Sequence, residues 1–146
     1  MGLFDAVDIA GSGLSAERLR MDVTAENLAN AQTTRGANGG AYRRKEVVLQ
    51  QVEGGGGFRT ALAGAMGGNR PGGVQAAGIV EDQSPLKQVY DPGHPDANAQ
   101  GYVQMPNVNP VTEMVDLIAA SRSYEANVTA MQTAKSMFAK TLELLR

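Results

Sequence analysis

The sequence predicts an α+β protein in which long N- and C-terminal helices pair as a coiled coil and a small β-rich domain is inserted between them. Residues 36–101 hold 15 of the 18 glycines, and every proline lies between Pro71 and Pro110. Because glycine and proline weaken helix interiors by about 1 and about 3 kcal/mol, long helices fit only the two ends. Both ends also carry apolar residues at the 3.5-residue period of paired helices. We expect helices over 1–32 and 110–146 and a glycine- and proline-rich middle domain over 33–109.

Length, composition and charge exclude several classes of protein. At 146 residues and 15.3 kDa the chain has room for one modest domain, and a net charge of -2 gives no basic surface for nucleic acid. The absence of cysteine excludes disulfides, thiolate nucleophiles and iron–sulfur clusters. No apolar stretch approaches the ~20 residues of a membrane span, and Asp5 stands where a Sec signal carries a basic residue. We therefore expect no nucleic acid partner, no membrane insertion and no cleaved signal.

The N-terminal segment 1–32 predicts one helix with a thin apolar seam. The apolar residues that recur every seventh position are Val7, Leu14, Met21 and Leu28. Gly11 and Gly13 fall inside the seam, where together they weaken a helix by roughly 2 kcal/mol. Two explanations stay open: the helix is kinked at the glycines, or another backbone approaches closely there.

The middle segment contains three strand-like pieces, over 47–52, 73–80 and 86–90. The intervening stretch 54–73 is glycine-rich and poor in apolar anchors, so we expect a flexible loop. Residues 91–95 read Asp-Pro-Gly-His-Pro and predict a turn.

The C-terminal segment predicts a long helix beginning at Pro110, with Asn109 as its N-cap. Ser121 and Lys135 interrupt an otherwise apolar row with strict 3, 4 spacing. The apolar members of that row are Met114, Leu117, Tyr124, Val128, Met131, Phe138, Leu142 and Leu145. Glu113 and Asp116 suit the positive end of the helix dipole, and we expect both to be solvated charges on the helix surface.

Two motifs have chemical alternatives. Residues 11–16 fit a G-x-G-x-x-A dinucleotide fingerprint, but that motif needs a preceding strand, and the ten preceding residues predict a helix. His94, the only histidine, lies near Asp91 and Asp96, yet its setting between a glycine and a proline favours a positioned turn residue over a metal ligand. We expect no catalytic residue, no cofactor and no metal.

Five segments resemble proteins of the bacterial flagellum. Residues 15–31, centred on Asn-Leu-Ala-Asn at 27–30, closely resemble the N-terminal signature shared by rod, hook and hook–filament junction proteins. The resemblance to the proximal rod proteins of the basal body lies in residues 90–97, with Asp-Pro-Gly-His-Pro, 101–111, with Met-Pro-Asn-Val-Asn-Pro, 114–117 and 121–127. The glycine-rich stretch 54–73 matches no part of that pattern.

The resemblance implies a structural, non-enzymatic subunit of the proximal rod, acting in motility without a small-molecule substrate. It implies export through the flagellar type III apparatus, and helical assembly with copies of itself and other rod proteins in the periplasmic space. The tube is then a hollow drive shaft that transmits torque and through which export continues. The alternatives are a cytoplasmic coiled-coil adaptor and a small enzyme or nucleotide-binding domain.

The apolar seams predict the assembly residues, because neighbouring subunits have to cover what a lone helix pair leaves exposed. On the N-terminal helix they are Val7, Leu14, Met21, Asn27, Leu28 and Asn30, and on the C-terminal helix they are the eight apolar residues of the row above. For Asn27 and Asn30 two roles stay open: hydrogen bonds across subunits, or bonds to the chain as it leaves the helix.

Overall fold

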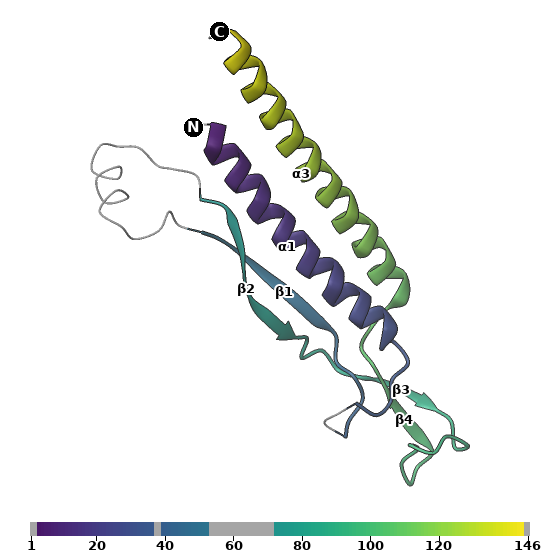
Figure 1. The fold of residues 1–146 in the computed structure, drawn as a ribbon. Helices are drawn as coiled ribbons and strands as arrows, with labels where there is room; N and C mark the ends of the chain where they lie inside the picture. The colour runs from purple at the N-terminus through teal and green to yellow at the C-terminus, as the bar shows by residue number, and fades with distance from the viewer. Residues whose placement is uncertain (1–2, 37–38, 53–71, 145–146) are drawn as a thin grey trace. The chain divides into compact units, whose positions relative to one another are not determined.

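The computed structural model describes residues 3–36, 39–52 and 72–144. Its elements in chain order are α1 (Leu3–Ala29), β1 (Lys45–Gln51), β2 (Val74–Glu81), β3 (Lys87–Tyr90), β4 (Tyr102–Met105) and α3 (Pro110–Leu144) (Figure 1). The strands form two two-stranded sheets, β1 with β2 and β3 with β4. The α+β class predicted from the sequence is confirmed.

The elements group into two compact units, each built from separate stretches of chain. The first unit comprises the described residues of Met1–Leu19, Leu49–Ala77 and Ala120–Arg146, and the second comprises those of Arg20–Val48 and Gly78–Ala119. Both helices and both strands of the first sheet therefore contribute to each unit.

In the first unit, α3 comes close to α1 at Gly13. A side-chain carbon built on Gly13 would lie 3.0 Å from Asn127 Nδ2, which is tighter than ordinary packing. α1 continues through Gly11 and Gly13 without a break. Of the two explanations for these glycines, the structure therefore supports close approach, with a side chain of α3 as the approaching group.

Also in the first unit, Ser12 ties the start of β2 to α1. The amide of Val74 donates to Ser12 Oγ (3.0 Å), which itself donates to the carbonyl of Ile9 (2.7 Å). At the end of β1, the amide of Val52 donates to the carbonyl of Gly73 (2.8 Å). These bonds anchor both strands where they meet the stretch 53–71; the expected flexible loop lies, apart from Gly72 and Gly73, outside the described residues.

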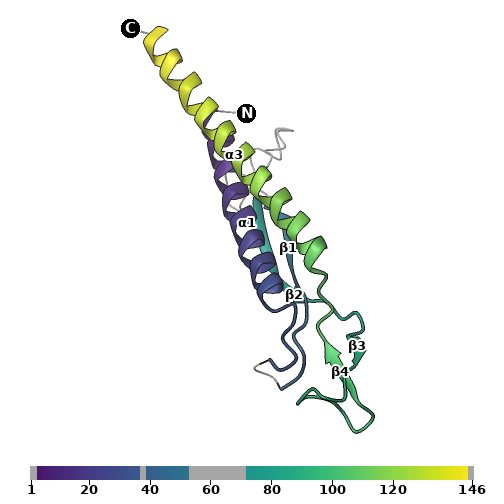
Figure 2. The same ribbon diagram turned by 90° about the vertical axis from the view of Figure 1, so that its right-hand side faces the viewer.

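In the second unit, β3 and β4 form an antiparallel hairpin whose strands lie side by side in both views (Figure 2). Val89 is paired with Val103 and Tyr90 with Tyr102. Val103 is only 2% exposed, so this face of β4 contributes to the small core. The sequence did not predict β4, because four residues between Gly101 and Pro106 are too few for alternation to be recognised.

The predicted seams are only partly buried. On α1, the predicted seam residues Val7, Leu14, Met21 and Leu28 are all half-buried. The buried residues of this helix are instead Ala10, Ala16, Val23, Thr24 and Asn27. On α3 the fully buried residues are Glu113, Ala120 and Ala134, each one position before a member of the predicted row. Of that row, Leu117, Tyr124, Val128 and Met131 are half-buried, Met114, Phe138 and Leu142 are exposed, and the side chain of Leu145 lies outside the described residues.

Gly101→Ala tests the hairpin turn. Gly101 has φ +81°, and an added Cβ would lie 2.9 Å from Tyr90 Cε2. We expect the free energy of unfolding to fall by about 1–2 kcal/mol, because a left-handed conformation is unfavourable for alanine. Gly93→Ala is the control in the same loop, since its Cβ would meet only Asp91 Oδ1 at 3.6 Å. Urea denaturation of both purified variants is the measurement, and equal losses would contradict the prediction.

Candidate functional site: a polar clasp in the second unit

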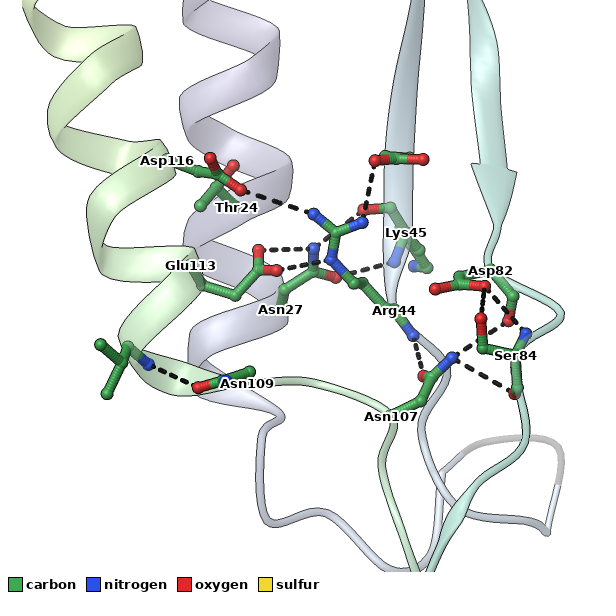
Figure 3. Close-up of polar contacts among 12 residues, drawn as sticks. Thr24, Asn27, Arg44, Lys45, Asp82, Ser84, Asn107, Asn109, Glu113 and Asp116 are labelled. Atoms are coloured by element: carbon green, nitrogen blue, oxygen red, sulfur yellow. Dashed lines mark hydrogen bonds and ion pairs between the residues drawn. The ribbon is translucent and has the colours of Figure 1, made fainter.

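Asn27, near the end of α1, lies at the centre of a cluster of polar side chains and is 1% exposed (Figure 3). Its Nδ2 donates to the carbonyl of Lys45 (2.8 Å) and to Glu113 Oε2 (3.0 Å). Its Oδ1 accepts from the amide of Lys45 (2.9 Å) and from the hydroxyl of Tyr42 (2.9 Å). The side-chain amide thus uses both of its donors and both lone pairs of its oxygen.

The local sequence explains why the chain returns to Asn27. After α1 it turns through bonds from Ala31 N to Leu28 O (3.3 Å) and from Thr33 N to Asn30 O (3.1 Å). Asn30 supports this turn, donating to the carbonyl of Glu26 (2.9 Å) and accepting from Thr33 Oγ1 (3.1 Å). Of the two roles left open for these asparagines, the structure therefore shows bonds within the chain for both.

Glu113, in the first turn of α3, is the buried charge of the cluster, at 1% exposure. Its Oε1 lies 2.6 Å from Arg44 Nε, and Arg44 also contacts Glu46 Oε1 (2.9 Å) and Asp116 Oδ2 (3.5 Å). The hydrogen bond to Glu113 holds the pKa of Arg44 above its ordinary value, although burial opposes that shift. The expectation that Glu113 and Asp116 are solvated surface charges is wrong for Glu113, because the chain supplies a guanidinium to pair it.

Asn107 extends the cluster to the segment after β2. Its Oδ1 accepts from the amide of Arg44 (2.8 Å), and its Nδ2 donates to the carbonyl of Asp82 (3.2 Å). Ser84 donates its hydroxyl and its amide to Asp82 Oδ1 (2.6 and 2.8 Å), and these bonds lower the pKa of Asp82. We call Asn27, Tyr42, Arg44, Asn107 and Glu113 the polar clasp, since they join α1, the segment before β1 and the start of α3.

Tyr42 forms the edge of the clasp. Lys45 Nζ lies 5.6 Å from the centre of the Tyr42 ring and 2.6 Å from Glu26 Oε1. Burial is the main cause that raises the pKa of Tyr42 to about 12, with the charges of Glu26 and Glu113 as further contributions. The hydroxyl therefore stays protonated at neutral pH and available as a donor to Asn27.

The clasp has the chemistry of a structural lock. Its amide, guanidinium and carboxylate groups are bonded to one another, whereas catalysis needs groups that converge on a space for substrate. Within the described ranges, no group of three or more His, Cys, Asp or Glu is placed to hold a metal ion. Neither helix has, among its described residues, an apolar stretch long enough to cross a membrane.

The two motifs with chemical alternatives have structural roles. Residues 11–16 lie inside α1 rather than after a strand, so the dinucleotide fingerprint is not formed. His94 Nδ1 accepts from the amide of Asp96 (3.1 Å), and the amide of Ala97 donates to the carbonyl of His94 (3.0 Å). His94 is thus a turn residue bonded to backbone.

Of the predicted assembly residues, only Asn27 belongs to the clasp. Sequence reasoning missed Tyr42, Arg44, Asn107 and Glu113. One signal was present for Glu113, because Glu113, Leu117, Ala120 and Tyr124 follow the 4, 3, 4 spacing of a helix seam. No pattern in the sequence pointed to Arg44 as its partner.

Comparisons with known proteins match both ends of the chain. A family model described as flagella basal body rod protein matches residues 8–37, and one described as flagellar basal body rod FlgEFG protein C-terminal matches residues 99–144. The first segment contains Asn27, and the second contains Asn107 and Glu113.

Full-length relatives are similar to the whole chain. The flagellar basal-body rod protein FlgC of Bacillus subtilis is 50% identical over 150 residues, covering 99% of each chain. The FlgC protein of Salmonella typhimurium is 47% identical over 144 residues, covering 99% of this chain and 98% of its own. That of Borreliella burgdorferi is 44% identical over 151 residues, covering 100% and 99%.

Asn27→Ala tests the clasp. The substitution leaves the Lys45 backbone, the Tyr42 hydroxyl and one oxygen of buried Glu113 without their partner, so we expect a loss of about 3 kcal/mol in the free energy of unfolding. Asn30→Ala is the matched control, with an expected loss of no more than about 1 kcal/mol, because its bonds are local and more exposed. Urea denaturation and amide exchange at Lys45 measure both, and similar losses would count against a central role for Asn27.

A pH titration tests Tyr42. Its pKa in the folded chain, about 12, lies above the ordinary value of 10.0, so folding favours the neutral phenol. Its contribution to stability is complete below pH 10 and is lost as the pH rises toward 12. We expect one of the four tyrosines to ionise near pH 12 in ultraviolet difference absorbance, and Tyr42→Phe to remove that step. A Tyr42→Phe curve that keeps the step would contradict the assignment.

Proposed function

The chain belongs to the FlgC family of flagellar basal-body rod proteins, and we propose that it assembles helically with copies of itself and other rod proteins into the hollow proximal rod. It is a structural subunit and not an enzyme, as the relatives confirm. The observation that carries the proposal is the similarity to FlgC proteins along the whole chain, from the first helix to the last. The rod transmits torque for motility and leaves a channel through which export continues.

The exposed side of α3 supports assembly as the mode of action. Met137, Phe138 and Leu142 are 52%, 38% and 53% exposed near its C-terminal end. Large apolar side chains at that exposure gain free energy when a neighbour covers them, at about 25 cal/mol per Å² of apolar surface. A head-to-tail contact that does not close then repeats into a helical tube.

Within the subunit, we propose that α1 and α3 pair as a coiled coil. The buried α3 residues Glu113, Ala120 and Ala134 and the half-buried Leu117, Tyr124, Asn127 and Met131 follow the alternating four- and three-residue spacing of such a seam. In this arrangement 1–32 and 110–146 are the axial helices of the rod, and 33–109 is the middle domain. That the predicted assembly residues make the contacts between subunits is also part of this proposal.

The family resemblance supports two further proposals, on export and location. The subunit reaches the rod through the flagellar type III export apparatus, and its place is the part of the rod in the periplasmic space. The cytoplasmic coiled-coil adaptor is the weaker alternative, because the relatives that are similar to this chain along its whole length are rod proteins. An adaptor would form a defined small oligomer and would be absent from purified basal bodies.

Leu142→Asp tests assembly through α3. Leu142 is exposed in the single chain, so an aspartate there is solvated in the monomer but is buried unpaired once a neighbour covers it. We expect rod incorporation and swimming to be lost while the unfolding free energy of the monomer is unchanged. Leu117→Asp is expected to stop assembly too, but Leu117 is half-buried in the second unit and its loss also weakens the fold.

Thr141→Asp is the matched control, since Thr141 is exposed and adjacent but polar. It should assemble and support swimming in a strain whose own copy has been deleted. Normal basal bodies containing Leu142→Asp would contradict the role of this surface. Absence of the wild-type chain from basal bodies would contradict the rod function itself.

A further inference from the structure

The second unit exposes an apolar row at the start of α3. Val111, Met114, Val115 and Ile118 are 66%, 45%, 61% and 55% exposed, and their spacing places them on one side of the helix. We call these four residues the helix patch. It lies outside the predicted seam except at Met114.

The polar clasp keeps charge away from the helix patch. Glu113 and Asp116 are the only charged residues between 110 and 119, and both pair with Arg44, at 2.6 and 3.5 Å. Glu113 is fully buried and Asp116 is half-buried. The outer side of these turns is therefore uncharged and aliphatic.

A second uncharged surface lies on the β3–β4 hairpin. Because Gln88 is paired with Gln104 and Tyr90 with Tyr102, these four residues share one face, opposite the face of buried Val103. Tyr90 is 65% and Tyr102 42% exposed, and both glutamines are exposed. We call these four residues the hairpin patch.

The tyrosines of the hairpin patch are held in place before any partner binds. Their rings meet edge to face, with centroids 5.3 Å apart. Gly101 leaves room for the Tyr90 ring, and the amide of Asp91 donates to the carbonyl of Gly101 (2.9 Å). Asn98 Oδ1 accepts from the amides of Gln100 and Tyr102 (both 2.9 Å) and fixes the turn. Such ordering in the free chain lowers the entropy cost of binding.

We propose that the helix patch of one copy docks on the hairpin patch of a second copy of this chain. This inference rests on the proposed function and names one of the contacts by which copies join. The centres of protein interfaces are depleted of charge and enriched in tyrosine and methionine, and the two patches together have that composition.

Charge and composition favour this pairing over others. None of the eight patch residues is charged, so the docked side chains themselves include no ion to desolvate. Arg35 and Asp96, which line the hollow beside Tyr102 and Gln104, lie 4.0 Å apart and pair with each other. Two different patches on one chain give a heterologous contact, which repeats from copy to copy instead of closing as a two-fold dimer. Each patch has four residues, whereas stable pairwise interfaces have about 20–30 a side, so we expect the contact only where a lattice reinforces it.

Disulfide cross-linking tests the docking, because the chain has no cysteine of its own. Val115→Cys in one copy and Gln104→Cys in another are produced together in a strain lacking the wild-type chain, and purified basal bodies are oxidised. We expect a cross-linked dimer at about tenfold or more the yield of the control pairs, because docked thiols have a high effective concentration. The controls replace Val115→Cys by Gln132→Cys, on the same helix, and Gln104→Cys by Lys87→Cys, on the other face of the hairpin.

Other outcomes overturn the docking. A dimer from Val115→Cys alone would mean that two helix patches meet, and a cross-link to a different rod protein would mean that the occupant is not a second copy. If both variants are in basal bodies without a cross-link, the docking fails and the rod function stands; if the wild-type chain is absent from basal bodies, the rod function fails. If Val115→Cys is not incorporated into basal bodies, Thr112→Cys, beside the helix patch, takes its place in the experiment, and the same outcomes support or overturn the docking.

Discussion

The buried carboxylate of Glu113 is the constraint on which the second unit depends. A charge removed from water costs several kcal/mol unless it is paired and hydrogen-bonded. Here Arg44 supplies the opposite charge and Asn27 supplies a second donor, at 2.6 and 3.0 Å. These three residues come from the start of α3, the segment before β1 and the end of α1, so satisfying one carboxylate places three distant parts of the chain together.

Register is the stronger reason for such a cluster than stability. A buried ion pair often contributes little net free energy relative to apolar residues of similar size, but a polar residue in a helix seam selects one alignment of the helices. Heptad patterns alone allow one helix to slide by seven residues against its partner. Because Glu113 finds Asn27 and Arg44 in only one alignment, the clasp fixes where α3 starts relative to α1 within the second unit.

The sequence predicted those parts of the fold that depend on residues close together along the chain, but not those that depend on contacts between distant residues. The helix start is an example: the amide of Val111 donates to Asn109 Oδ1 (3.1 Å), as an N-cap requires, and α3 begins at Pro110. Arg44 and Glu113 are separated by 69 positions, and no periodicity connects them. The sequence also did not predict which α3 residues are buried. A search for large apolar side chains passes over alanine, although alanine fits well where helices approach closely.

Small buried residues on α3 and large exposed ones have a common explanation. Alanines are among the few fully buried residues of both helices, and Gly13 lies beside Asn127, but such small residues each bury little apolar area, so packing within one chain uses few of the large side chains. Met114 and Leu142 stay exposed in the single chain, as the proposed contacts with neighbouring subunits require. In a protein that functions as a monomer these residues would be a liability for aggregation. In the proposed rod assembly they are an advantage, because apolar surface that the single chain has not already buried is available to stabilise the assembled state.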